Sequence, residues 1–149
     1  MRTRTFLTLL AVFMAACTNT AGGGSPSGLV VAADLQHHRW ILESINGEIV
    51  VADDFDDTVP ELDFGEQMHV SGNTGCNRVS GTAELRGEYF QIPVLAGTRR
   101  LCSPARNEME LTMQNVLGQE SIISIDADKN LTLTTDNVIL RFRLWDWVK

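Results

Sequence analysis

Apolar residues from position 40 onward recur mostly at every second position, which is the spacing of half-buried strands. Residues 40–45 form the first such segment. Asn46-Gly47 then predicts a type I′ hairpin turn, with residues 48–51 as the returning strand. Further strands are predicted around Leu62 and Phe64, around Met68 and Val70, along the row Val79, Gly81, Ala83 and Leu85, and over residues 89–92, with turns at 72–75 and 86–87.

A helical spacing follows Ser103-Pro104, a pair that suits an N-cap and a proline at the first helical position. Gly118 stands where a helix would end. The pattern predicts a helix over residues 104–117 whose apolar face carries Met109, Met113, Val116 and Leu117. Strands resume at 122–125, 131–133 and 138–145. Seven or more short strands with one late helix predict an α+β domain, with a mainly antiparallel sheet packed on that helix.

The N-terminal segment has a different pattern. Arg2 and Arg4 precede a short apolar run, and small residues then lead to Cys17. This is typical of a secretory signal peptide, since the run is about half of the roughly 20 residues that a membrane-spanning helix needs. The cysteine after Ala15-Ala16 resembles a bacterial lipoprotein lipobox, which would make residues 1–16 the signal peptide and Cys17 the lipid attachment site. An ordinary signal peptide with an incidental cysteine is the alternative.

The segment after Cys17 is predicted to be a flexible tether. Residues 17–34 are rich in glycine and serine, which leaves the folded domain at 35–149. A lipid anchor would hold this domain at a membrane. Thr18 after the cysteine resembles outer-membrane sorting, so we expect an outer-membrane location with the domain facing the periplasm.

The charge balance limits the classes of partner. Without Arg2 and Arg4 the chain keeps 10 of its 12 basic residues against 19 acidic ones, a formal charge of −9. That balance argues against nucleic acid and against adsorption to anionic lipid, because both select positive surfaces.

Two cysteines remain once Cys17 carries lipid. Cys76 and Cys102 would face an oxidising compartment, where thiols pair, so we expect one disulfide between them. Such a bond would stabilise the domain by roughly 3 to 4 kcal/mol in the chain-entropy model. A metal site and a redox pair are the alternatives, and the spacing does not match a C-x-x-C redox motif.

Three spaced segments carry a family resemblance. They are residues 35–47, then Gly75-Cys76-Asn77 followed by Gly81, and finally residues 98–102 followed by Glu108. Together they resemble the META domain family of HslJ-type heat-shock lipoproteins, over about residues 35–145, with Leu101 where methionine is common.

The resemblance implies a half-barrel-like antiparallel sheet packed on one helix. It also implies a role in envelope and heat stress and in tolerance of the antibiotic novobiocin, and it supplies no catalytic residue. We expect a non-enzymatic protein that acts through an envelope protein partner. Secretin pilot lipoproteins, which have a related architecture, suggest the alternative of binding an apolar ligand or a lipid tail.

No constellation of residues predicts an enzyme, a cofactor or a metal site. His37 and His38 are neighbours that should point to opposite faces of a strand, and His69 is alone in its segment. The acidic run at 53–57 lacks the glycine and the alternating ligands of a calcium loop. Asn77 and Thr98 either form a polar site or satisfy buried backbone groups beside the cysteines, and we favour the second interpretation.

The last predicted strand carries two alternating rows of side chains. Val138, Leu140, Phe142 and Leu144 form one row, which is assigned to the core. Arg141, Arg143, Trp145 and Trp147 form the other, a candidate interaction surface because arginine and tryptophan are common in binding hot spots. In the alternative, the tryptophans close the end of the sheet and the arginines pair with acidic neighbours.

The size of the space between helix and sheet would distinguish the two proposed functions. A roomy cavity lined by Phe64, Met109 and Met113 would favour the apolar-ligand binder. A core packed to the usual density would favour the interaction module.

Overall fold

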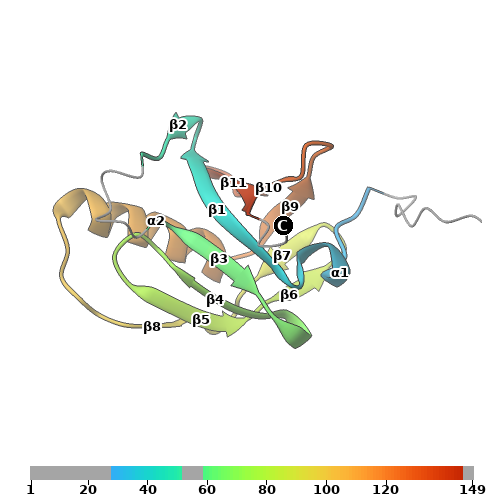
Figure 1. The fold of residues 1–149 in the computed structure, drawn as a ribbon, viewed down its shortest axis with the longest axis horizontal. Helices are drawn as coiled ribbons and strands as arrows, with labels where there is room; N and C mark the ends of the chain where they lie inside the picture. Colours follow the sequence, from blue (N-terminus) through green and yellow to red (C-terminus); the bar gives the residue numbers. More distant parts are fainter. Residues whose placement is uncertain (1–27, 52–58, 146–149) are drawn as a thin grey trace, which may run out of the picture.

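The computed structural model describes residues 28–51 and 59–145 of the chain. A short helix, α1 (Ala32–Leu35), precedes the first strand (Figure 1). The strands are β1 (His38–Ile45), β2 (Glu48–Ile49), β3 (Glu61–Phe64), β4 (His69–Asn73), β5 (Arg78–Thr82), β6 (Glu84–Arg86), β7 (Tyr89–Gln91), β8 (Ala96–Gly97), β9 (Ser121–Ile125), β10 (Asn130–Thr134) and β11 (Ile139–Trp145). One turn of 3-10 helix, η2 (Glu66–Met68), lies between β3 and β4, and the long helix α2 (Pro104–Gly118) lies between β8 and β9.

The strands form one antiparallel sheet that curls around α2. Its order in the described residues is β6-β7-β9-β10-β11-β1-β3-β4-β5-β8, with β2 paired to β1. Strands β5 and β6 are separated in sequence by Ala83 alone, yet they lie toward opposite ends of this order. One residue cannot cross a flat sheet of this width, so the sheet curls until its two ends approach each other. The predicted α+β class and half-barrel-like sheet are confirmed.

Short-range signals placed most of the turns correctly. Asn46 and Gly47 both have positive φ, as a type I′ hairpin requires, although β2 ends at Ile49 and is shorter than predicted. Gly87 also has positive φ, in the turn between β6 and β7.

Two predictions near β4 are wrong in detail. Met68 belongs to η2, with a left-handed backbone, so the strand begins one residue later. Gly72 and Asn73 lie within β4, and the turn follows at 74–77. Gly72 is needed in the strand because a Cβ there would collide with the carbonyl oxygen of Glu61 on β3.

Helix α2 covers the inner face of the sheet, as predicted. Met113, Val116 and Leu117 are completely buried, and Met109 is partly buried against the same core. Ser103 has the extended backbone of an N-cap, but its side chain makes no capping hydrogen bond. The helix is held mainly by tertiary burial of its apolar face, which is the usual source of helix stability in proteins.

The core is filled by large side chains from the sheet and the helix. Phe64 and Phe90 meet edge to face with ring centroids 6.1 Å apart. Leu140 and Phe142 are fully buried, which confirms the inward row of the last strand. Among the described residues, no helix is both long enough and apolar enough to span a membrane.

Candidate interaction surface

The two cysteines lie at one end of the domain, near the start of α2. Cys76 follows β4 and Cys102 precedes α2, and the structure joins them by a disulfide with Cα atoms 5.9 Å apart. This is the pairing expected from the sequence. The bond ties the turn after β4 to the segment that connects β8 with α2.

Asn77 is the centre of a buried polar network beside this disulfide. Its side-chain oxygen accepts hydrogen bonds from the Arg100 backbone N–H at 2.7 Å and from the Thr98 hydroxyl at 2.8 Å. Its side-chain amide donates to the Arg100 carbonyl at 3.1 Å and to a Glu110 carboxylate oxygen at 2.9 Å. Thr98 also accepts from the Arg78 backbone N–H at 3.1 Å. The structural interpretation of Asn77 and Thr98 is therefore confirmed.

Three further polar residues, which the sequence reading missed, extend this network. Asn107 accepts from the Cys102 N–H and donates to the Cys102 carbonyl, and Arg106 donates to the Gly75 carbonyl at 2.8 Å. Glu110 lies three residues after Asn107, so the two share a helix face. The spacing of Asn107 and Glu110 is the one signal by which the sequence could have linked these two residues to the cysteine segment.

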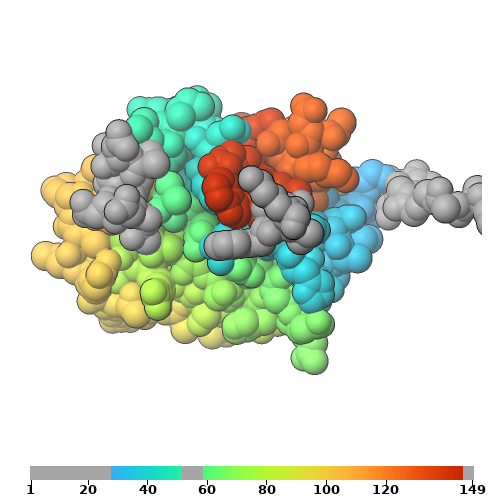
Figure 2. All heavy atoms as spheres, viewed as in Figure 1, coloured from blue at the N-terminus to red at the C-terminus, as the bar shows by residue number. Residues whose placement is uncertain are grey.

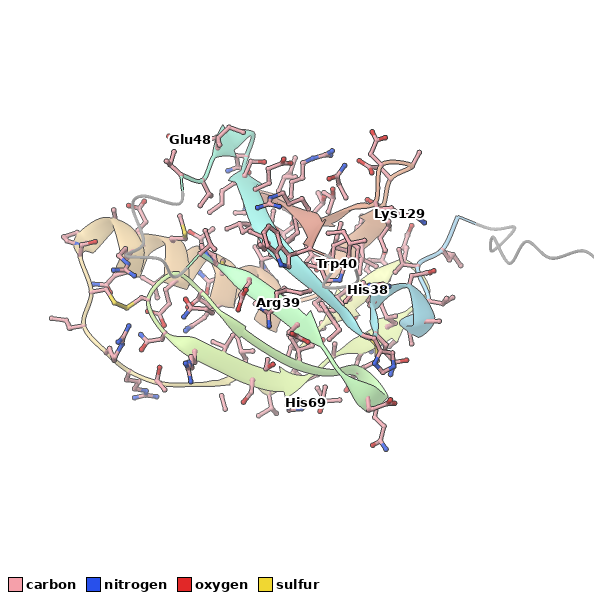
Figure 3. The ribbon with its side chains drawn as sticks, in the orientation of Figure 1. His38, Arg39, Trp40, Glu48, His69 and Lys129 are labelled. Carbon is pink, nitrogen blue, oxygen red and sulfur yellow. A yellow bond between two sulfur atoms is a disulfide. The ribbon has the colours of Figure 1, made fainter. Side chains whose placement is uncertain are left out.

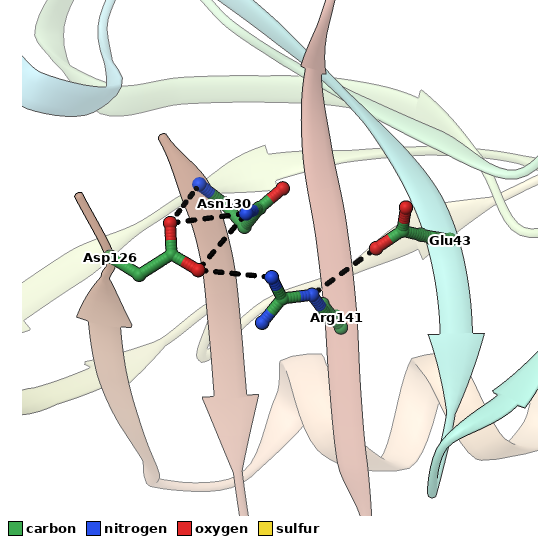
Figure 4. A network of polar contacts seen from close by, with 4 residues as sticks. All are labelled: Glu43, Asp126, Asn130 and Arg141. Carbon is green, nitrogen blue, oxygen red and sulfur yellow. Dashed lines mark hydrogen bonds and ion pairs between the residues drawn. The ribbon is translucent and has the colours of Figure 1, made fainter. Parts of the chain in front are cut away.

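Arg141 of the proposed interaction row is held by acidic neighbours. Its guanidinium lies 3.2 Å from Glu43 and 3.0 Å from Asp126. Figure 4 shows Arg141 between these two carboxylates. Glu43 lies in a bulge of β1 between Leu42 and Ser44, and Ser44 is the residue opposite Arg141 in the register. For Arg141 the structure therefore supports the alternative in which the arginines of this row pair with acids.

Asp126 also accepts hydrogen bonds from Asn130. Hydrogen bonds from the backbone and the side chain of Asn130, followed by the contact with Arg141, hold the pKa of Asp126 below its usual value. Asp126 is exposed to solvent, so this network positions Arg141 more than it stabilises the fold.

The rest of the row is more accessible. The Arg143 guanidinium stacks over the ring of Trp145, 5.1 Å from its centroid, and both residues are exposed. Ile41 lies opposite Arg143 on β1, which continues the row with an apolar side chain. Trp147 lies outside the described residues. Arg143 and Trp145 thus form an exposed cation–π pair on the outer face of the sheet.

A polar hollow lies next to this pair, on the outer face of β1, β3, β4 and β5. It has a volume of about 620 Å³. Arg39 lies opposite Trp145 and holds two carboxylates, Asp63 at 3.2 Å and Glu61 at 3.6 Å. Ser71 and Ser80 continue the lining. The hollow offers hydrogen bonds, but Arg39, Glu61 and Asp63 in its lining are already paired with one another.

The structure does not bring the histidines together. His37 precedes β1, where its backbone is left-handed, and its ring lies 3.4 Å from Glu66. The expectation that His37 shares a strand with His38 is therefore wrong. Figure 3 shows His38 on β1 and His69 at the start of β4. Within residues 28–51 and 59–145, no three histidine, cysteine or acidic side chains are grouped as a metal site would need. The acidic run at 53–57 lies outside the described residues.

The residues expected to line a ligand cavity divide into two groups. Phe64 and Met113 are fully buried members of the packed core. Met109 instead borders an open cleft of about 350 Å³ between α2 and the β1–β2 hairpin. The side chains named for the ligand binder therefore do not share one site.

The fold and this polar network define the class of protein: a strongly curled antiparallel sheet wrapped around one helix, with a disulfide and a buried asparagine at the start of that helix. The sequence profile of the META domain matches residues 33–145, and the chain belongs to this family.

Individual relatives agree. The heat shock protein HslJ of Escherichia coli strain K12 is 37% identical over 139 residues, covering 92% of this chain and 96% of that protein. A protein structure solved by NMR is similar with a TM-score of 0.70 and 37% identity, over 80% of this chain and 99% of that chain. A second NMR structure, from Burkholderia xenovorans, has a TM-score of 0.63 at 23% identity, over 88% and 99% of the two chains, and shows the fold alone.

Proposed function

We propose that this protein is a lipid-anchored stress protein of the outer membrane that acts by protein interaction and not by catalysis. The family membership and the similarity to a heat shock protein support the stress role. The filled core supports an interaction module over a binder of apolar ligands, because Phe64 and Met113 are fully buried between sheet and helix.

The surface proposed to carry this function is the row at the end of the last strand. The observation that supports it is the exposed Arg143–Trp145 pair, since arginine and tryptophan are enriched in binding hot spots. Trp147 is proposed to extend the row. Arg141 is proposed to keep β11 in position through Glu43, with a smaller direct part in binding.

The test compares two variants in cells under heat and novobiocin stress. Arg143→Ser with Trp145→Ser removes the exposed pair. The control is Arg86→Ser with Tyr89→Ser, which removes a facing arginine and aromatic from the β6–β7 hairpin. Tyr89 and Trp145 are both 43% exposed, so the two changes remove comparable surface.

The proposal expects lost stress protection in the Arg143/Trp145 variant alone, with unchanged unfolding midpoints in both. Equal protection by both variants would contradict the role of the row.

The anchor is tested separately at Cys17. Cys17→Ser should leave an unlipidated precursor or a soluble periplasmic form, because the thiol is the proposed attachment atom. Labelled fatty acid incorporated into the variant as into the wild type, with unchanged outer-membrane fractionation, would overturn the lipoprotein assignment.

A further inference from the structure

The segment between β8 and α2 holds one leucine out into solvent. Leu101 is 96% exposed, the most exposed of the large apolar residues described. Its two neighbours are fixed: the Arg100 N–H bonds to Asn77 at 2.7 Å, and the Cys102 N–H bonds to Asn107 at 3.3 Å. The disulfide at Cys102 fixes the segment once more. An exposed apolar side chain on so well anchored a backbone is pre-organised for contact.

Two arginines directly precede this leucine. Arg99 and Arg100 are both exposed, and neither makes an ion pair with an acidic side chain of the described residues. Arg86 and Arg141, by contrast, are ion-paired. We call Arg99, Arg100 and Leu101 the basic tip. In a chain of net charge −7 it is a local positive site with an apolar centre.

An apolar cleft with an acidic rim lies near the same end of the domain. It is the opening of about 350 Å³ between the β1–β2 hairpin and the first half of α2. Glu48 and Glu108 border it, and neither is ion-paired to a basic side chain in the described part of the chain. Figure 3 shows Glu48 on β2, pointing away from the body of the domain. Its apolar lining comes from Ile45, Ile49, Val50, Val51, Ala105 and Met109.

We propose that the basic tip of one copy of this chain binds in the acid-rimmed cleft of a second copy. Leu101 would fill the apolar floor, and Arg99 and Arg100 would meet Glu48 and Glu108. The cleft is ample for a leucine side chain, and the charges of its rim are opposite to those of the tip. The tip does not occupy the cleft of its own chain, because Leu101 is almost fully exposed.

The tip and the cleft both adjoin α2. Two residues separate the tip from the start of α2, and Ala105, Glu108 and Met109 of the cleft lie in the first turns of that helix. In Figures 1 and 2 this yellow segment forms one end of the molecule, opposite the blue end where the described chain begins. The cleft is lined by Ala105, Glu108 and Met109 of α2, whereas Arg99 and Arg100 adjoin other residues of the same helix, so each copy presents both a tip and a cleft. This inference is independent of the proposed stress role.

The test uses the full chain in cells, with two copies carrying different epitope tags. A photo-crosslinking amino acid replaces Leu101, and in the control it replaces Leu111, which is 60% exposed on α2. The proposal expects a crosslinked dimer containing both tags from position 101, at least fivefold more abundant than from position 111. Peptide mapping should place the crosslink on the second copy near Ile49, Val51 or Met109.

Charge exchange tests the rim. Glu48→Arg with Glu108→Arg should lower the dimer crosslink at least fivefold, and adding Arg99→Glu with Arg100→Glu should restore part of it. Arg99→Glu alone keeps the hydrogen bond from Arg100 to the Cys76 carbonyl, so it provides the test if the double change disturbs folding. Crosslinks to other proteins or to lipid alone, no crosslink at all, or a dimer insensitive to the rim charges would each overturn the proposal.

Discussion

Replacing Asn77 by alanine tests whether the polar network beside the disulfide stabilises the domain. Asn77 is 3% exposed and makes hydrogen bonds to Thr98, to both backbone groups of Arg100 and to Glu110. Each buried group left without a partner costs about 1 to 3 kcal/mol. Arg100 is exposed, so water can replace part of what it loses. We therefore expect a loss of about 3 kcal/mol in the free energy of unfolding.

Urea denaturation of the oxidised protein measures this loss. The slope of the unfolding free energy against urea should stay unchanged, because the surface exposed on unfolding is nearly the same. Thr98→Val is the matched control: it removes one hydroxyl from the network and should cost about 1 kcal/mol. A change below about 0.5 kcal/mol for Asn77→Ala, which is typical of ordinary surface sites, would refute the argument.

Three other measurements test the disulfide, the helix and the acidic contact of the last strand. Thiol counting on denatured protein isolated without reductant should find no free thiol at Cys76 or Cys102, and two reactive thiols would contradict the bond. Met113→Asp buries a charge and should cost about 4 to 5 kcal/mol, whereas the same change at the exposed Leu111 should have little effect on the unfolding midpoint. The pKa of Asp126 is lower in the folded state than in the unfolded chain. Its contribution to stability is therefore fully present above the unfolded-state pKa and is lost as the pH falls through the folded-state pKa. Asp126→Asn should therefore flatten the fall in the urea midpoint below about pH 4, and an unchanged pH profile would contradict this.

The elements that the sequence predicted well are those with local causes. The turn at Asn46-Gly47 follows from positive φ at both residues, and α2 follows from its proline start and the spacing of its apolar face. The inward row of the last strand follows from alternation alone.

Predictions failed where a distant backbone decides the conformation. Gly72 reads as a turn residue locally, but the approach of Glu61 on β3 is what requires it within β4. Met68 continues an apolar alternation, yet its backbone belongs to η2. The curl of the sheet is also nonlocal, because it depends on β5 and β6 lying toward opposite ends of the strand order.

The sequence also could not show which residues of the candidate surfaces are available to a partner. Alternation predicted that Arg141 and Arg143 lie on one face, and it could not tell them apart. In the structure a bulge and two acids, Glu43 and Asp126, hold Arg141, while Arg143 stacks on Trp145 and stays exposed. Whether an arginine of this row is available for a partner is therefore set by the residues that β1 and the β9–β10 turn place nearby. The same reasoning applies to Leu101, whose neighbours are held by two amide side chains: Asn77, 23 residues before Arg100, and Asn107 in the helix that follows.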